Sequence, residues 1–180
     1  QAKVNGIEVA FLRRSTASRR LVWSDEFNGA PNSPVDSRRW RHETGGAWGE
    51  GELQSYTSRK ANSHQDGRGR LRIVARAERF RGMDSITRDY TSARISTQGR
   101  YSFRYGLFEA RLQMPVGRGV WPAFWALGAP YRGNYQNWPG IGEFDVMENV
   151  NGINSVWGVL HCGVNPGGPC NETQGIGASR

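Results

Sequence analysis

Cysteine, histidine and long hydrophobic runs are all scarce in this sequence. Its 180 residues contain two Cys and three His, and no cluster of them has the spacing of a zinc site. No apolar run approaches the roughly 18 residues needed to cross a bilayer, which excludes a transmembrane helix. With 37% hydrophobic residues, 24 Gly and 8 Pro, the composition also excludes collagen, coiled coil and low-complexity disorder. The length fits one folded domain.

Acidic residues are outnumbered by basic ones, 16 to 24, which gives a net charge of +8. The excess is almost entirely arginine and is spread along the chain, as expected for a solvated basic face. A nucleic-acid-binding protein is the alternative, and its binding would weaken steeply with salt. No DNA- or RNA-binding signature accompanies the charge, so we expect neither nucleic acid nor a membrane as a partner.

The two cysteines, Cys162 and Cys170, flank a segment rich in Gly and Pro. The chain can turn back on itself there, which favours a small disulfide-closed loop; two free thiols are the alternative. A disulfide implies an oxidising compartment, and the adjoining Asn171-Glu172-Thr173 is a weak N-glycosylation signal that agrees with it. We therefore expect a secreted, extracellular or cell-wall protein.

Polar and apolar residues alternate with a period of two along much of the chain. Residues 106–114 and 156–161 are clear examples, and Gly, Pro, Asn and Asp separate such stretches. No stretch predicts an amphipathic helix. The sequence therefore predicts an all-β fold in which two sheets stack to bury their apolar faces. This texture runs over residues 21–180, whereas residues 1–20 are expected to be an N-terminal leader or tail.

One strand-forming segment contains three carboxylates within six residues: Glu143, Asp145 and Glu148. Glu143 and Asp145 are two positions apart and share a face of a regular strand. Glu148 is five positions from Glu143, so strict alternation would send it to the other face. One extra residue in a β-bulge, most simply at Val146-Met147, would bring all three acids to one face.

Three acids on one face have a chemical consequence. Neighbouring carboxylates raise one another's pKa, so at least one is expected to stay protonated near neutral pH. A protonated acid beside an ionised nucleophile is what cleavage of a glycosidic bond requires. Carboxyl groups about 5 Å apart give retention of configuration, and about 6.5–9.5 Å gives inversion. The spacing alone leaves two alternatives open, an exposed acidic strand face and a calcium site.

The segment from Glu143 to Glu148 resembles the active-site signature of glycoside hydrolase family 16, in its longer form with one extra residue. Five earlier segments resemble the same family in the same order. They are residues 21–27, 52–56, 90–95, 105–111 and 121–127. The resemblance extends from about residue 21 to residue 177.

The resemblance implies a β-jelly roll of two curved antiparallel sheets, of the concanavalin A-like type, and a retaining endo-glycosidase. In that mechanism Glu143 would be the nucleophile and Glu148 the acid/base, with Asp145 between them modulating the charge of the nucleophile. The longer signature is similar to the laminarinase branch, which cleaves internal β-1,3 bonds of β-glucans; mixed β-1,3/1,4 bonds stay an alternative. A non-catalytic β-glucan-binding protein on the same fold is a second alternative, although retention of all three acids favours the enzyme.

Other properties follow from the same resemblance. Residues 161–172 resemble fungal members, and the family's domain continues beyond the end of this chain, so we expect C-terminal strands to be missing. No cofactor is implied. A structural calcium ion occurs in some members, but the residues present here do not support one. The partner implied is a β-glucan polysaccharide, bound by a monomer.

Several further residues match positions in the family's substrate cleft. Trp side chains offer flat apolar surfaces for sugar rings, and Arg, Tyr and His can hydrogen-bond hydroxyl groups or the acids. The matching residues are Tyr56, Arg94, Trp121, Trp125, Trp138 and His161. Core packing is the alternative for each tryptophan, and a structural role is the alternative for His161. We assign Trp23, Trp40 and Trp157 to packing.

Overall fold

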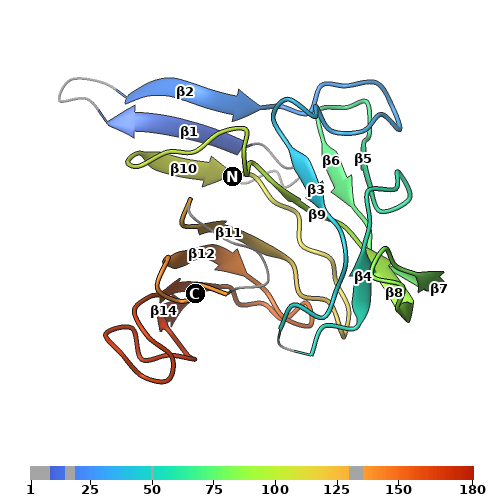
Figure 1. Cartoon of the computed structure of the whole chain (residues 1–180). Helices are drawn as coiled ribbons and strands as arrows, with labels where there is room; N and C mark the ends of the chain where they lie inside the picture. Colours follow the sequence, from blue (N-terminus) through green and yellow to red (C-terminus); the bar gives the residue numbers. More distant parts are fainter. Residues whose placement is uncertain (1–8, 15–18, 50, 130–135) are drawn as a thin grey trace. The chain divides into compact units, whose positions relative to one another are not determined.

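The computed structural model describes residues 9–14, 19–49, 51–129 and 136–180. Within these ranges the chain forms fourteen β-strands and no helix (Figure 1). The all-β class predicted from the period of two is therefore confirmed. In the same ranges no helix is long and apolar enough to span a membrane.

The chain divides into two compact units, Gln1–Gln113 and Met114–Arg180. The described part of the first unit holds small sheets with the strand orders β10-β1-β2, β3-β9, β4-β8-β7 and β5-β6. Its strands are β1 (Val9–Arg14), β2 (Arg19–Asp25), β3 (Arg41–Glu43), β4 (Gln54–Tyr56), β5 (Ser63–Gln65), β6 (Leu71–Ile73), β7 (Arg76–Arg81), β8 (Thr87–Ser92), β9 (Arg94–Ser96) and β10 (Leu107–Ala110). Their pairings are antiparallel, except that β4 and β8 run parallel.

Strand β1 lies in the segment that was expected from the sequence to be a leader or tail. Strand β1 pairs with β10 on one side and with β2 on the other, so residues 9–14 form the middle strand of a sheet. The boundary that the sequence suggested at residue 20 lies inside β2. Backbone hydrogen bonds join these residues to the sheet, although their side-chain pattern did not predict a strand.

Aromatic side chains fill the interior of the first unit. Phe27 and Trp40 are buried and lie with their rings 6.0 Å apart. Trp23 meets Trp40 edge to face at 5.4 Å, and the indole nitrogen of Trp40 donates a hydrogen bond to Asp25 at 2.8 Å. The assignment of Trp23 and Trp40 to packing is therefore confirmed.

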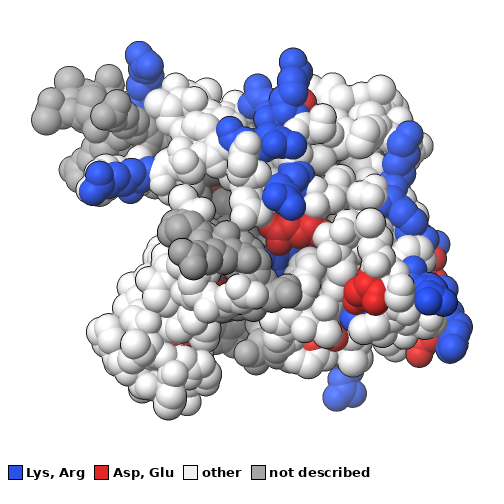
Figure 2. Space-filling model, in the orientation of Figure 1, with Lys and Arg blue, Asp and Glu red and all other residues white. Residues whose placement is uncertain are grey.

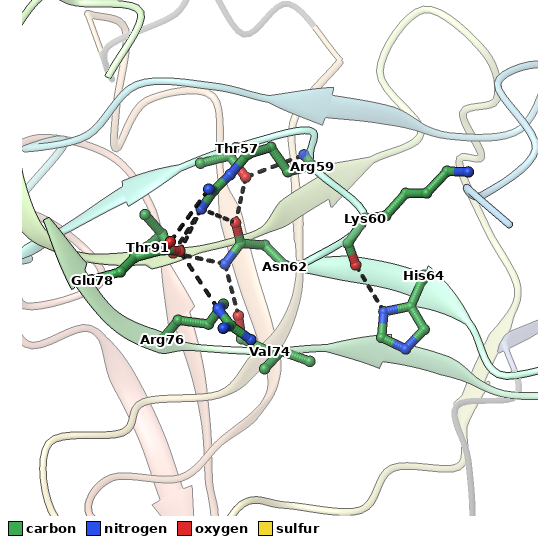
Figure 3. A network of polar contacts seen from close by, with 9 residues as sticks. All are labelled: Thr57, Arg59, Lys60, Asn62, His64, Val74, Arg76, Glu78 and Thr91. Carbon is green, nitrogen blue, oxygen red and sulfur yellow. Dashed lines mark hydrogen bonds and ion pairs between the residues drawn. The ribbon is translucent and has the colours of Figure 1, made fainter. Parts of the chain in front are cut away.

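Asn62 is fully buried at the centre of a polar network that ties the loop after β4 to β8 (Figure 3). Its amide oxygen accepts hydrogen bonds from Thr57 at 2.6 Å and from Arg59 at 3.0 Å. Its amide nitrogen donates to the Thr91 hydroxyl at 2.8 Å and to the Val74 carbonyl at 3.1 Å. All four hydrogen-bonding positions of the amide are used, so this side chain holds the loop in one conformation.

Replacing Asn62 by Ala is expected to lower the free energy of unfolding by about 2–4 kcal/mol, because its buried partners lose their hydrogen bonds. Urea unfolding measures the change. Lys60→Ala is the matched control: this side chain is exposed on the same loop, and its loss should change stability by less than about 0.5 kcal/mol. Equal, small effects of both substitutions would show that the network does not stabilise the unit.

Basic side chains lie in several separate groups on the face drawn in Figure 2. Some are paired locally with acids: Arg38 lies 2.9 Å from Asp36, and Arg88 lies 2.8 Å from Asp84. The Arg38 side chain is 88% exposed, so its pair is solvated and contributes little to stability, whereas the Arg88 side chain is only 9% exposed. The separate groups of basic side chains agree with the solvated basic face expected from the sequence.

The described part of the second unit contains one antiparallel sheet, in which each strand pairs with the next along the chain. Its strands are β11 (Ala123–Leu127), β12 (Glu143–Glu148), β13 (Trp157–His161) and β14 (Ile176–Ser179). Phe144, Leu160 and Ile176 are paired across three of these strands and line one face. The alternation of side chains leaves the other face to the carboxylates of β12.

Candidate active site

Strand β12 contains a β-bulge where the sequence predicted one. On the β11 side, Phe124 pairs with Met147 and the next residue, Trp125, pairs with Asp145, which leaves Val146 as the extra residue. The register against β13 shifts over the same interval. A bulge inserts one residue without a partner and changes the parity of the residues beyond it. The bulge predicted at Val146-Met147 is confirmed.

The bulge places all three acids on one face of the sheet. Glu143 pairs with His161, Asp145 with Val159 and Glu148 with Trp157. These partners are alternate residues of β13, so they share a face, and paired residues of neighbouring strands point the same way. The predicted common face for Glu143, Asp145 and Glu148 is therefore confirmed.

Asp145 is the carboxyl of the group whose pKa is raised. Its side chain is almost completely buried, with the residue 5% exposed. Burial, followed by repulsion from Glu143 and Glu148, raises the pKa of Asp145 to about 7, while His161 acts in the opposite direction. The sequence predicted a raised pKa within this cluster; the structure assigns it to the central carboxyl, which is the most buried.

The raised pKa predicts how stability depends on pH. Between pH 4 and pH 7 the folded chain keeps a proton on Asp145 that the unfolded chain has lost, so the contribution of this group falls as pH rises. Asp145→Asn should therefore be more stabilising at pH 8 than at pH 4, with a difference in the free energy of unfolding on the order of a few kcal/mol, measured by urea unfolding at both pH values. Asp89→Asn, which removes an exposed carboxylate, is the control. A pH-independent difference between wild type and Asp145→Asn would refute the assignment.

Two tryptophans donate hydrogen bonds to the outer acids. The indole nitrogen of Trp138 donates to Glu143 at 2.6 Å, and that of Trp121 donates to Glu148 at 2.8 Å. Each indole N–H thus satisfies one oxygen of an outer carboxyl group. Trp121 remains half exposed, so its ring keeps surface for a ligand. Trp125 lies opposite Asp145 on β11 and shares the acid face.

His161 connects the central acid to a carboxylate that sequence reasoning missed. Its Nε2 lies 3.5 Å from an oxygen of Asp145, and its Nδ1 lies 2.8 Å from an oxygen of Glu172. The other oxygen of Glu172 accepts the backbone N–H of Cys162 at 2.7 Å. Glu172 follows the predicted disulfide, which joins Cys162 to Cys170 and is confirmed. Only its position beside this closed loop could have drawn attention to it.

The strand register shows on which face of the sheet Trp157 lies. The sequence placed it in the packing group with Trp23 and Trp40. It pairs with Glu148 across β12 and β13, so it lies on the acid face beside the outer carboxylate. The alternation of side chains along β12, with its bulge, places Glu148 on this face. The strand register that pairs Glu148 with Trp157 comes only from the tertiary fold.

Tyr56 and Arg94 belong to the first unit, where they join a cluster of their own. Arg94 forms an ion pair with Glu43 at 2.8 Å, and its guanidinium lies 4.9 Å from the ring centre of Trp48. Trp48 stacks on Tyr56 with the ring centres 5.1 Å apart. Burial, and next the hydrogen bond to Glu52, raise the pKa of the Tyr56 phenol. Sequence reasoning missed Trp48, whose neighbours are remote in the chain.

No group of three or more His, Cys, Asp or Glu side chains within the described ranges is arranged to hold a metal ion. The acids of β12 are instead satisfied by indole and imidazole groups. Carboxyl groups held by these hydrogen-bonding partners are suited to proton transfer and nucleophilic attack.

Related proteins carry the same domain. The chain is 45% identical over 148 residues to a beta-glucanase of Rhodothermus marinus, covering 78% of this chain and 48% of that protein. It is 35% identical over 170 residues to glucan endo-1,3-beta-glucosidase A1 of Niallia circulans, covering 88% of this chain and 24% of that protein. The chain thus spans about half of the first relative and about a quarter of the second. Both are bacterial, and the fungal type stays an expectation.

Solved structures show the same architecture. An endo-1,3-beta-glucanase from Streptomyces sioyaensis matches with a TM-score of 0.71 and 42% identity, and the laminarinase from Rhodothermus marinus with 0.75 and 38%. Each match covers 88% of this chain and 60% of the other. Residues 54–174 match the family described as "XgeA-like, catalytic GH16 domain". The chain therefore belongs to the catalytic domains of glycoside hydrolase family 16.

Proposed function

We propose that this protein hydrolyses internal β-1,3 or mixed β-1,3/1,4 bonds of β-glucans with retention of configuration. The observation that carries the proposal is the face of β12, where one bulge brings Glu143, Asp145 and Glu148 together. The names of the relatives, a beta-glucanase and endo-1,3-glucanases, support a β-glucan as the substrate. Retention and the two-step mechanism follow from the family resemblance of the acid segment.

In the first step, Glu143 attacks the anomeric carbon while Glu148 donates a proton to the departing glycosidic oxygen. The bond from the carbon to that oxygen breaks, and a covalent glycosyl–enzyme ester forms on Glu143. In the second step, Glu148 takes a proton from water, and the resulting hydroxide displaces Glu143. The indole N–H of Trp138 donates a hydrogen bond to Glu143 and holds its carboxyl group in place for the attack.

A protonated Asp145 has a specific place in this scheme. It separates Glu143 from Glu148 and, while it keeps its proton, adds no negative charge beside Glu143. The repulsion that an ionised Asp145 would exert on an attacking Glu143 carboxylate is then absent. Trp121, Trp125 and Trp157 surround the acids on the same unit and offer aromatic surface for sugar rings.

Hydrolysis of laminarin, lichenan and agarose by the purified protein tests the proposal. We expect oligosaccharides from laminarin or lichenan and none from agarose. Proton NMR during the first minutes should show the β-anomer of the new reducing end before mutarotation. An initial α-anomer would overturn the retaining mechanism, and binding of laminarin without hydrolysis would favour the alternative, a β-glucan-binding protein.

The disulfide supports a place of action outside the reducing cytoplasm, at the cell surface, in the wall or in the medium. We propose secretion on this basis. Mass analysis of protein isolated from its natural source, alkylated without reduction, checks it. Two alkylated thiols at Cys162 and Cys170 would argue against this location.

A further inference from the structure

Glu172 is a fully enclosed carboxylate with two hydrogen-bond donors. Its side chain has no exposed surface. One oxygen faces Nδ1 of His161 at 2.8 Å, and the other accepts the backbone N–H of Cys162 at 2.7 Å. A buried carboxylate is costly unless each oxygen is paired, and here each one has a donor. The geometry therefore places the Nδ1 proton of His161 between the ring and Glu172.

The opposite nitrogen of the same ring faces the central acid. Nε2 lies 3.5 Å from Asp145, whose carboxyl keeps its proton to about neutral pH because its pKa is raised by burial. With Nδ1 committed to Glu172, Nε2 is the free acceptor of a neutral imidazole. Glu172, His161 and Asp145 thus form a chain of polar contacts. The proton between Nε2 of His161 and the carboxyl group of Asp145 can lie on either of these two groups.

The ring of His161 is held in place from other directions as well. Trp138 lies with its ring centre 5.4 Å away and tilted by 48°. Gly175, which has a φ of +75°, passes so close that an added Cβ would lie 2.9 Å from Cε1 of the imidazole. Glu143 is the register partner of His161 on β12. Among the described residues, Asp145, Glu143 and Glu172 are thus the charged groups that face this ring from its neighbouring strands and loop.

We propose that Glu172 is a positioning residue: it fixes the tautomer and orientation of His161, which in turn sets the protonation state of Asp145 during catalysis. The inference rests on the proposed glycosidase function and goes beyond it, because it brings a carboxylate outside the acid signature into the control of the site. The disulfide loop between Cys162 and Cys170 then has a purpose in the mechanism, since Glu172 follows it by two residues and bonds to the backbone at its start.

The substitution Glu172→Gln tests the proposal with little change in shape. The amide has one acceptor oxygen in place of two, and its N–H group cannot accept the Nδ1 proton. We expect kcat to fall about 10- to 100-fold, as for other partners that orient a functional histidine. Without the Glu172 carboxylate, a positive charge on His161 is less stable and stabilises an ionised Asp145 less. The fall of kcat at high pH that follows ionisation of Asp145 should therefore move up by about 1 pH unit. Glu26→Gln, an exposed carboxylate of the first unit, is the matched control and should change neither value.

A double-mutant cycle separates positioning from stability. His161→Gln should shift the pH profile as Glu172→Gln does, and the two together should do no more than His161→Gln alone. A lower melting temperature with an unchanged pH profile would show that Glu172 is only structural and would overturn the proposal. So would additive effects of the two substitutions.

Nitrogen NMR of the wild-type protein gives a readout that needs neither a folded variant nor activity. We expect a proton on Nδ1 and none on Nε2 when the imidazole of His161 is neutral. A neutral ring protonated on Nε2 would overturn the proposal. A wild type that shows the expected tautomer but hydrolyses no glucan would instead refute the proposed function, while the coupling of Glu172 to Asp145 would still be measurable from the carbon NMR titration of Asp145.

Discussion

Glu143→Ala is expected to reduce kcat on laminarin by about 10³-fold or more, while binding of the glucan survives. The nucleophile is lost, and with it the covalent intermediate, but the aromatic surface around the acids is intact. Added azide or formate should restore turnover, because a small anion can occupy the space left by the side chain and attack the anomeric carbon. The product of rescue by azide should be a glycosyl azide of inverted configuration, which NMR identifies.

The control for this experiment is Glu109→Ala, which removes an exposed carboxylate from β10 and should leave kcat within a few fold. Isothermal titration with laminarin oligosaccharides measures binding for both variants. Substantial wild-type activity in Glu143→Ala would remove Glu143 from the role of nucleophile. If both activity and binding are lost, the substitution has either removed the nucleophile or disturbed the structure of the site. Rescue by azide then decides between a catalytic and a structural role of Glu143.

Deletion of Met147 is expected to keep the fold of the sheet but to lower activity on β-1,3-glucan about 100-fold. Without this residue, Glu143 and Glu148 are four positions apart, and ordinary alternation places them on one face without a bulge. Val146 would then pair with Phe124, which now pairs with Met147. The neighbouring strands are shaped around the bulge, so the carboxyl groups move, and a displacement near 1 Å costs about 100-fold.

Met147→Ala is the matched variant, because it removes most of the side chain and keeps the residue count. It should retain the bulge and lose much less activity than the deletion. A crystal structure of the deletion variant should show all three acids still on one face, with a changed separation between Glu143 and Glu148. If the deletion turns Glu148 to the opposite face, the bulge is not the device that aligns the acids.

Much of the acid site could be predicted from local pattern. The odd spacing between Glu143 and Glu148 requires a bulge if the acids are to act together, and the bulge occurs at Val146-Met147. The turn-rich segment between the cysteines predicted a closed loop, and the disulfide is present. In each case the deciding property is a feature of a few consecutive residues: the alternation of a strand, or the ability of Gly and Pro to reverse the chain.

Roles that depend on partners remote in the chain were less accessible. Trp121 and Trp138 were expected to stack on sugars, and in the structure their indole nitrogens donate to Glu148 and Glu143. Trp157 was assigned to packing and lies opposite Glu148. The direction of an indole N–H and the register of a strand pair are set by how loops and neighbouring strands meet, which the spacing of one segment does not contain.

The sequence by itself determined the all-β class, the common face of the three acids and the need for an extra residue between Asp145 and Glu148, because alternation is a local property of an extended backbone. Only the tertiary structure decided that the pKa of Asp145 is raised and that Glu172 reaches Asp145 through His161. Burial, Coulomb interaction and hydrogen bonding depend on what three strands and a disulfide loop bring to the same place, and that arrangement exists only in the folded chain.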